Sequence, residues 1–397
     1  MARAANVTMV AMAAIGDVWA DAGSPAWEAG AVYTGTAWGV LTGDHDGDSA
    51  WHGNVDLTLT LDTGRLIGLD DSTLFIYVLN DHGGKFNKNL ATGQGIDNME
   101  VETNATRLFE AWVEKRFLDG RMSVRAGLYA VDGEFYVTDS SGLFIHPAQG
   151  IGTDLGQTGL NGPSIFPVTS MGIRVLAEPV PELYLMGAVV DAVPGDPDDP
   201  RGTHVILDEG DGALGIVEAG WRFPDTLEQS LPGKIAVGGY AYSEEFDDLL
   251  DVDVNGDPIT RDARGFYVMA ERAILRDPAN PARGPSVFVR YGHADPDIHQ
   301  FGHAVTAGVT WQGPFAARAD DIVGFGIAAA TTGDKFRQAA ATAGEPAATA
   351  EIAYEWSYLA PVNEWLVVQP DVQYIQYTGD GDIDDALVAG LRIEISY

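Results

Sequence analysis

The sequence has no cysteine, few basic residues and no long apolar run. Without cysteine, the chain can form no disulfide, zinc–thiolate site or thiol nucleophile. Its 23 Lys and Arg stand against 58 Asp and Glu, for a formal net charge of −35, and such a chain repels the phosphate backbone of a nucleic acid. No apolar run nears the roughly 18 residues of a membrane helix, so only strands could cross a bilayer.

What the sequence has in quantity is alternation of apolar and polar residues. In Ala386–Tyr397, every second residue back from Tyr397 is apolar, and the residues between them are mostly small or charged. This period of two predicts a strand with one apolar and one polar face. The alternation recurs in sixteen segments. Most have close to the roughly 9–11 residues of a tilted transmembrane strand.

The predicted strands are Glu28–Trp38, Trp51–Asp62, Ser72–Asp81, Thr106–Phe117, Met122–Ala130, Thr169–Leu176, Leu183–Ala192, Leu214–Phe223, Lys234–Ser243, Gly265–Ala273, Ser286–Ala294, Phe301–Trp311, Asp320–Thr331, Ala348–Tyr358, Glu364–Gln376 and Ala386–Tyr397. Long polar loops and mostly shorter turns alternate between them, as in outer-membrane barrels. We therefore predict an all-β fold, a 16-stranded antiparallel transmembrane β-barrel over residues 27–397 with long external loops. Closure leaves no unpaired strand edge in lipid. A large soluble sandwich or propeller is the alternative.

Residues 1–26 precede the first predicted strand. They contain one arginine, a short Ala, Val and Met stretch, and the tripeptide Val-Trp-Ala that ends at Ala20. This order is typical of a secretory signal peptide with cleavage after Ala20. A retained N-terminal segment that flanks the barrel is the alternative.

Several stretches resemble one family of porins. "RMSVRAGLYAVDGEFYVTDSSGLFIHPAQGIG", "NGPSIFPVTSMGIRV", "VPGDPDDPRGTH" and "DDALVAGLRIEISY" are similar to sequences of the bacterial carbohydrate-selective porins, the OprB-type family. The resemblance covers residues 27–397. It implies a porin in the outer membrane of a Gram-negative bacterium, through which small carbohydrates diffuse passively and which needs no cofactor.

Two other functions are compatible with the sequence. One is a general, mildly cation-selective diffusion porin, since an acidic vestibule favours cations and neutral solutes over anions. The other is a plugged barrel with a structural or surface attachment role. An enzyme is not expected, because the nucleophile, zinc-protease and phosphate-loop motifs are missing. The lipid bilayer is the expected partner, and both a monomer and a homo-oligomer fit the sequence.

The longest connection is Val131–Val168, which would be the third external loop. Its 38 residues exceed a plain connection, and its aromatic residues favour a small core of its own. The resemblance implies that it folds into the lumen and narrows the pore. A lid packed on the other external loops is the alternative.

Strand parity places several charged and aromatic side chains on the lumen side. Each guanidinium group offers five fixed donors to the hydroxyl groups of a sugar, and aromatic rings offer flat apolar faces. The predicted substrate-binding and constriction residues are Arg125, Arg174, Arg290, Glu110, Tyr129, Trp112 and Phe144. The same parity places inward Arg222, Arg392, Glu218 and Glu271. Alternatively, the arginines only neutralise the acidic residues that face them.

One acidic loop has the spacing of a calcium-binding loop. Asp251, Asp253, Asn255 and Asp262 fall at positions 1, 3, 5 and 12, with glycine at position 6. Because oxygen ligands suit Ca²⁺, a structural calcium in this external loop is one expectation. A solvated acidic turn is the other, since no helix pair flanks the loop and Pro258 falls where it must close.

Overall fold

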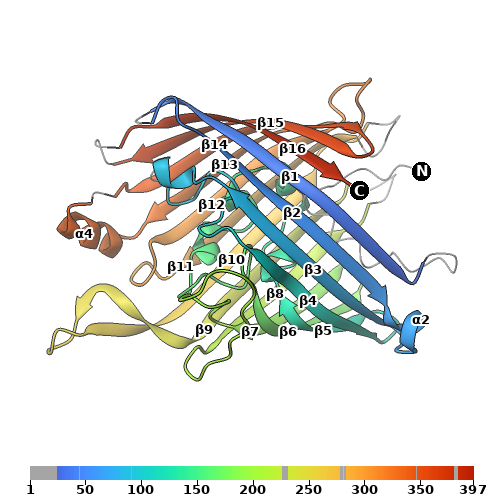
Figure 1. Cartoon of the computed structure of the whole chain (residues 1–397), viewed down its shortest axis with the longest axis horizontal. Coiled ribbons are helices and arrows are strands. Elements are labelled where there is room, and N and C mark those ends of the chain that lie inside the picture. The colour runs from blue at the N-terminus through green and yellow to red at the C-terminus, as the bar shows by residue number, and fades with distance from the viewer. Residues whose placement is uncertain are drawn as a thin grey trace.

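The chain forms a closed barrel. The computed structural model describes residues 25–397 apart from 44, 91, 226–230, 278–279, 281–282, 346 and 380–382. In these residues sixteen antiparallel strands pair in sequence order, and β1 pairs with β16 to close the barrel (Figure 1). The predicted fold is confirmed. The segment predicted as a signal peptide or N-terminal segment lies almost wholly outside the described residues.

The strands are β1 (Trp27–Thr42), β2 (Ser49–Asp62), β3 (Ser72–Gly83), β4 (Thr106–Phe117), β5 (Met122–Tyr129), β6 (Ser170–Val180), β7 (Leu183–Asp191), β8 (Ala213–Phe223), β9 (Gly233–Val252), β10 (Pro258–Ala273), β11 (Gly284–Ala294), β12 (Phe301–Gln312), β13 (Ile322–Thr332), β14 (Ala350–Asn363), β15 (Leu366–Thr378) and β16 (Ala386–Ser396). The helical segments are α2 (Thr63–Ile67), η1 (Asn87–Leu90), η2 (Val131–Gly133), η3 (Asp139–Leu143), η4 (Pro147–Gln149), α3 (Thr153–Gly156) and α4 (Asp334–Ala343). No helix of the described residues is long and apolar enough to cross a membrane.

At the seam between β1 and β16, alternate side chains lie on the inner and the outer face of the barrel. Arg392 lies opposite Thr36 in the register of β1 and β16, and both side chains are buried. Leu391 and Ile395, the neighbours on the other parity, are exposed. An apolar face that is exposed around a closed barrel matches the lipid-facing band of outer-membrane proteins.

The last residue takes part in the seam. The backbone N–H of Tyr397 donates to the carbonyl oxygen of Ala31 at 2.9 Å, and the Tyr397 side chain is fully exposed. A chain that ends at Ser396 loses an interfacial aromatic ring and the two backbone hydrogen bonds between Tyr397 and Ala31. We expect it to be made at normal levels but to reach the outer membrane in much smaller amounts, measured by immunoblots of fractionated cells. Equal outer-membrane levels of the two chains would contradict this expectation.

Two parts of the external region differ from the prediction. The segment expected to be a loop between the ninth and tenth strands is a hairpin, because β9 extends to Val252 and β10 begins at Pro258. The ten-residue helix α4, which packs against β9, was not predicted (Figure 1). Both errors have one cause, since acidic and alanine-rich segments that face water carry no apolar alternation to identify them.

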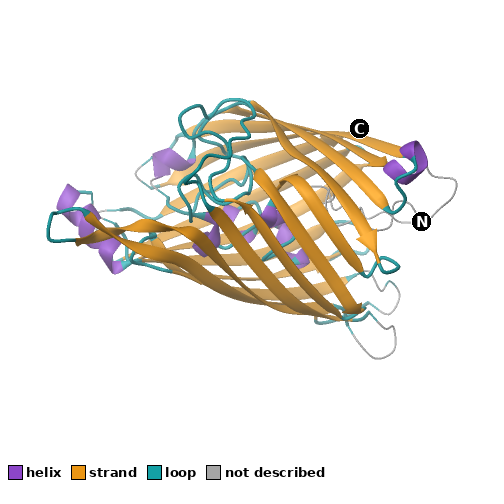
Figure 2. Cartoon of the chain, turned by 90° about the horizontal axis from the view of Figure 1, so that it is seen from below, coloured by secondary structure: helices purple, strands orange, loops and turns teal. Residues whose placement is uncertain are grey.

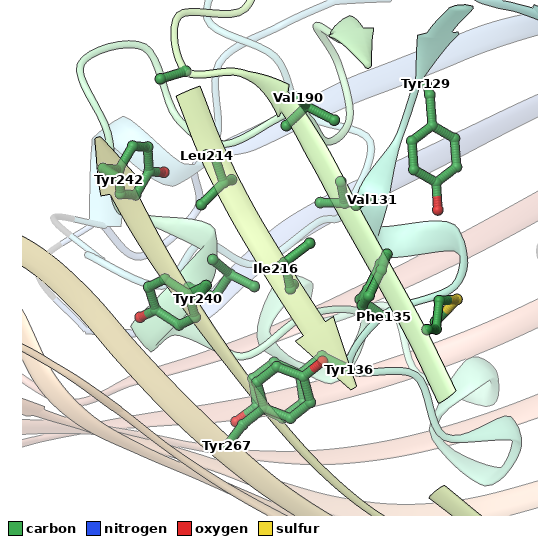
Figure 3. Packing of buried hydrophobic residues seen from close by; sticks show 14 of the residues in the cluster. Tyr129, Val131, Phe135, Tyr136, Val190, Leu214, Ile216, Tyr240, Tyr242 and Tyr267 are labelled. Carbon is green, nitrogen blue, oxygen red and sulfur yellow. The ribbon is translucent and has the colours of Figure 1, made fainter. Parts of the chain in front are cut away.

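The hydrophobic core lies inside the barrel, between the wall and the segment Val131–Val168, here called the inward loop. Helical segments are visible inside the ring of strands in Figure 2. Val131, Phe135 and Tyr136 of the loop pack against inward residues of β7 to β10, as Figure 3 shows. The ring of Tyr136 stacks on that of Tyr267, with 4.0 Å between centroids. Buried aromatic rings hold the loop against one side of the lumen.

Candidate functional site

Arg290 on β11 anchors the inward loop to the barrel wall. Its side chain is fully buried, and its guanidinium group donates hydrogen bonds to four carbonyl groups of the loop. The acceptors are the carbonyl oxygens of Tyr136, Ala148, Gln149 and Gly150, at 2.7–3.1 Å. Nε donates to the Thr306 hydroxyl at 2.8 Å. All of the nitrogen atoms therefore bond to protein groups, and the fork geometry of arginine suits this multiple contact.

Three inward glutamates bind amide groups of the same loop. Glu218 on β8 accepts from the N–H of Tyr136 at 2.9 Å, and Glu271 on β10 accepts from the N–H of Ser140 at 2.9 Å. Glu355 on β14 accepts from the N–H groups of Ile145 and His146. Each carboxyl group thus satisfies backbone N–H groups that would otherwise be buried without an acceptor. The loop thus lies against inward side chains from β8 to β14.

A second loop, residues 84–105, also lies inside the barrel, and sequence reasoning missed it. Asp97 accepts hydrogen bonds from Arg392 of β16 and from the indole of Trp38, both at 2.7 Å. Glu351 of β14 accepts from the N–H groups of Gly93 and Gln94. Arg392 was predicted to face inward and does so, but its partner lies 295 residues away, and no local pattern reveals such a pairing.

The opposite wall carries a group of four charged residues, here called the Arg–Glu cluster (Glu114, Arg125, Glu134 and Arg174). Arg125 and Arg174 are directly opposite each other in the register of β5 and β6. Glu114 of β4 bonds to both guanidinium groups, at 2.8 and 2.9 Å. Glu134, from the start of the inward loop, bonds to Arg174 at 2.8 Å and to Arg125 at 3.3 Å. Two carboxylates thus offset two adjacent positive charges that would otherwise repel each other.

The other predicted site residues support this cluster or the loop. The ring of Trp112 lies 3.8 Å from the Arg125 guanidinium carbon, and the hydroxyl of Tyr129 donates to Glu134. Glu110 accepts from the N–H of Ala130 at 2.9 Å. Phe144, within the inward loop, lies instead beside Phe288 of β11, with 5.9 Å between the ring centroids. All five predicted residues named here are buried.

Comparison with known proteins decides the family. The family model described as "Carbohydrate-selective porin, OprB family" matches residues 46–397. Porin B of Pseudomonas aeruginosa is 25% identical over 396 residues, which cover 91% of this chain and 86% of that protein. The putative porin QuiX of Acinetobacter baylyi is 22% identical over 374 residues, covering 87% and 83%.

The chain belongs to the OprB family of carbohydrate-selective porins. Among solved structures, the high-pH structure of OprB from Pseudomonas putida superposes with a TM-score of 0.82 at 22% identity, over 94% of each chain. The low-pH structure of the same protein gives a TM-score of 0.61 over 94% of this chain and 93% of that one. These similarities confirm the fold, and the family assignment places the barrel in the outer membrane of a Gram-negative bacterium as a porin for sugar diffusion. The porin family and the barrel fold indicate a channel.

Within this OprB-family barrel, the predicted residues fall into two groups. Arg125, Arg174, Glu110, Tyr129 and Trp112 come together on β4 to β6. Arg290, on the wall beneath the inward loop, and Phe144, within that loop, lie apart from them. Sugar contact by any of the seven remains a prediction. The buried contacts favour the alternative role that the sequence also allowed, neutralising and supporting the wall.

Glu134, like Glu114, is a site residue that sequence reasoning missed. Its side chain is 19% exposed, whereas those of Arg125 and Arg174 are 5% and 1% exposed. Burial raises the pKa of a carboxyl group, but the charges of Arg125 and Arg174 outweigh this effect and lower the pKa of Glu134. It is therefore ionised at neutral pH. Its place directly after an arginine-bearing strand was the available signal.

The residues of the predicted calcium loop do not converge. Asp251 forms ion pairs with Lys335 of α4 at 2.8 Å and with Arg261 at 3.5 Å, while Asp253 accepts from the N–H of Asn255 in the hairpin turn. Asp262 lies on β10, opposite Glu245 of β9. No group of three or more His, Asp or Glu among the described residues could hold a metal ion. The geometry favours the acidic turn, with lysine and arginine supplying the positive charge.

The helix α3 of the inward loop contains a buried acid, Asp154. Burial raises the pKa of Asp154 to about 7, although the hydroxyl of Tyr136 donates to it and partly lowers that pKa. Asp154 packs so closely on Gly292 that no Cβ fits there. Between the unfolded pKa near 3.8 and about 7, the folded state binds the extra proton, so this group lowers stability as pH rises through that window.

We therefore expect Asp154→Asn to change the pH dependence of unfolding. Asparagine stays neutral, so the thermal midpoint of the variant should rise relative to the parent between about pH 4 and pH 7. Differential scanning calorimetry in detergent at both pH values measures the two midpoints. Parallel pH profiles for the two proteins would show that Asp154 does not titrate in this range.

Proposed function

We propose that small sugars cross the constriction along the inward faces of β2 to β6, past the carboxylate of Glu134. This proposal rests on the position of the two internal loops, which are anchored mainly to the other strands of the wall. Apart from Glu134 at its start, the inward loop bonds mainly to side chains of β8 to β14, and residues 84–105 bond to β1, β14 and β16. On β2 and β3, Asp56, Thr58 and Tyr77 stay partly exposed. This side keeps polar groups available to a solute.

The chemistry of this path suits hydroxyl groups. Glu134 is held in one position by Arg125, Arg174 and Tyr129, so it can accept a hydrogen bond from a sugar without rearranging. On the adjoining strands β2 and β3 of the same wall, Asp56 accepts from the Tyr77 hydroxyl at 2.7 Å. Each hydrogen bond exchanged from water to sugar contributes about 0.5–1.5 kcal/mol. Binding is then weak, around the millimolar range at about −4 kcal/mol, which permits release on the far side.

Liposome swelling tests the proposal. We expect purified protein to admit a hexose faster than a zwitterionic amino acid of similar size, and Glu134→Gln to reduce that preference. Glutamine keeps the size of the side chain but replaces one acceptor oxygen with a donor group. Arg272→Ala, on the outward face near the periplasmic end of β10, is the matched control. Equal rates for sugar and amino acid in the parent protein would identify a general porin instead.

A further inference from the structure

A groove on the outer surface of the barrel lies near its external rim. It has a volume of about 660 Å³ and runs over β8 to β11. Its floor consists of small residues, Gly215, Gly239 and Ala241, on outward positions of β8 and β9. These residues face outward, because Ala241 is exposed between the buried side chains of Tyr240 and Tyr242. The groove therefore faces the membrane and not the lumen.

The height of the groove matches the outer leaflet. Gly265, in its lining, pairs with Ala294, the last residue of β11. Gly215 is the third residue of β8, which follows an external loop. Both positions lie at the external ends of their strands. At that level the apolar band of an outer-membrane barrel meets the lipid headgroups.

The groove has an apolar part and a charged part. Val217 and Phe266 are 62% and 44% exposed and form apolar walls. Arg264 and His293 line the same groove. The Arg264 guanidinium forms no ion pair or hydrogen bond with any residue that the structure describes. His293 uses Nδ1 in a contact of 2.8 Å with the Gly302 carbonyl, which leaves Nε2 for a ligand.

Arg264 is exposed and forms no ion pair, whereas most arginines among the described residues do. The sequence has 58 acidic residues, and the arginines on the lumen side, such as Arg125 and Arg174, are paired with them. Arg264 instead lies among apolar groups at the lipid interface, where an anionic headgroup would complement it. Asp295, at the upper edge of the groove, adds an acceptor suited to a sugar hydroxyl.

We propose that this groove binds a phosphorylated glycolipid of the outer leaflet. The phosphate contacts Arg264, a sugar hydroxyl of the headgroup donates to Asp295, and an acyl chain lies on the glycine and alanine floor between Val217 and Phe266. Each part of the ligand meets a matching part of the groove. A free phosphate would use only the arginine, and a second copy of the chain would not need a basic residue in an apolar groove.

Native mass spectrometry of the full-length protein with defined diphosphorylated lipid A tests this. We expect one lipid to bind the parent protein. Arg264→Ala, which removes the charge, and Ala241→Leu, which fills the floor, should each weaken binding about tenfold, the loss of one charged or well-packed contact. Arg272→Ala, an outward arginine at the other end of β10, should bind as the parent does. Heat-modifiable mobility on gels confirms that each variant is folded.

Three results would overturn the proposal. Parent-like lipid binding by both groove variants would place the lipid elsewhere. Displacement of the lipid by millimolar inorganic phosphate, together with no effect of Ala241→Leu, would indicate a phosphate site. A change of oligomeric state in Ala241→Leu, measured by light scattering without any lipid bound to the parent, would show that a second copy covers the groove. Sugar permeation should be unchanged in all these variants, so failure here leaves the proposed sugar path unaffected.

Discussion

Replacing Arg290 with alanine is expected to widen the channel and destabilise the barrel at once. The guanidinium group holds four carbonyl groups of the inward loop, and the residue is fully buried. Alanine leaves these acceptors without their donor, which should lower the free energy of unfolding by about 3 kcal/mol or more. Because the loop occupies the lumen, its release from β11 should raise the single-channel conductance.

Planar bilayer recordings and urea unfolding in detergent measure these two effects. Arg290→Lys is the matched control, since lysine keeps the charge but lacks the planar fork that reaches several carbonyls. It should fall between the parent and the alanine variant in both measurements. An alanine variant with parental conductance and stability would show that the buried aromatic contacts alone hold the loop.

Replacing Glu134 with alanine is the second change with a large expected effect. Arg125 and Arg174 lie side by side, and Glu134 is one of only two carboxylates that bond to both of them among the described residues. Without it, two guanidinium groups share Glu114. Breaking a largely buried ion pair costs about 3–5 kcal/mol. The charge that the cluster presents to the pore should also change from negative to positive.

Reversal potentials across a salt gradient test the change of sign. Cation preference should fall in Glu134→Ala, and to a smaller degree in Glu134→Gln, which keeps a hydrogen-bond acceptor. The triple variant Arg125→Ala, Arg174→Ala, Glu134→Ala removes both charges that the glutamate offsets and should recover part of the cation preference. An unchanged reversal potential in Glu134→Ala would mean that ions do not pass this cluster.

The sequence predicts the strands of the barrel wall better than the loops that lie inside the barrel. Each transmembrane strand has one lipid-facing parity, so Leu391 and Ile395 identify β16 and place Arg392 inward without any knowledge of its partners. The same parity placed Arg125, Arg174 and Arg290 correctly on the lumen side. Which side chains of a strand face the lumen is thus a local property, and the alternation of apolar and polar residues indicates it.

What those inward side chains bind is not local. Arg290 bonds to carbonyl groups about 140 residues or more distant in the chain, and any residue type presents such a carbonyl group. Asp97, in the loop of residues 84–105, bonds to Arg392, which lies 295 residues further along the chain. A loop that enters a wet lumen can stay polar, so residues 84–105 carry no pattern that separates them from an external loop.

Block of ion current by sugar is the most direct test that this barrel is a sugar channel with a weak site at its constriction. In planar bilayers, adding a hexose should reduce the current through the parent protein in a saturable way, with half-block in about the millimolar range. Block should weaken in Glu134→Gln and persist in Arg272→Ala. A current that falls only as solution viscosity predicts, at every sugar concentration, would contradict the account.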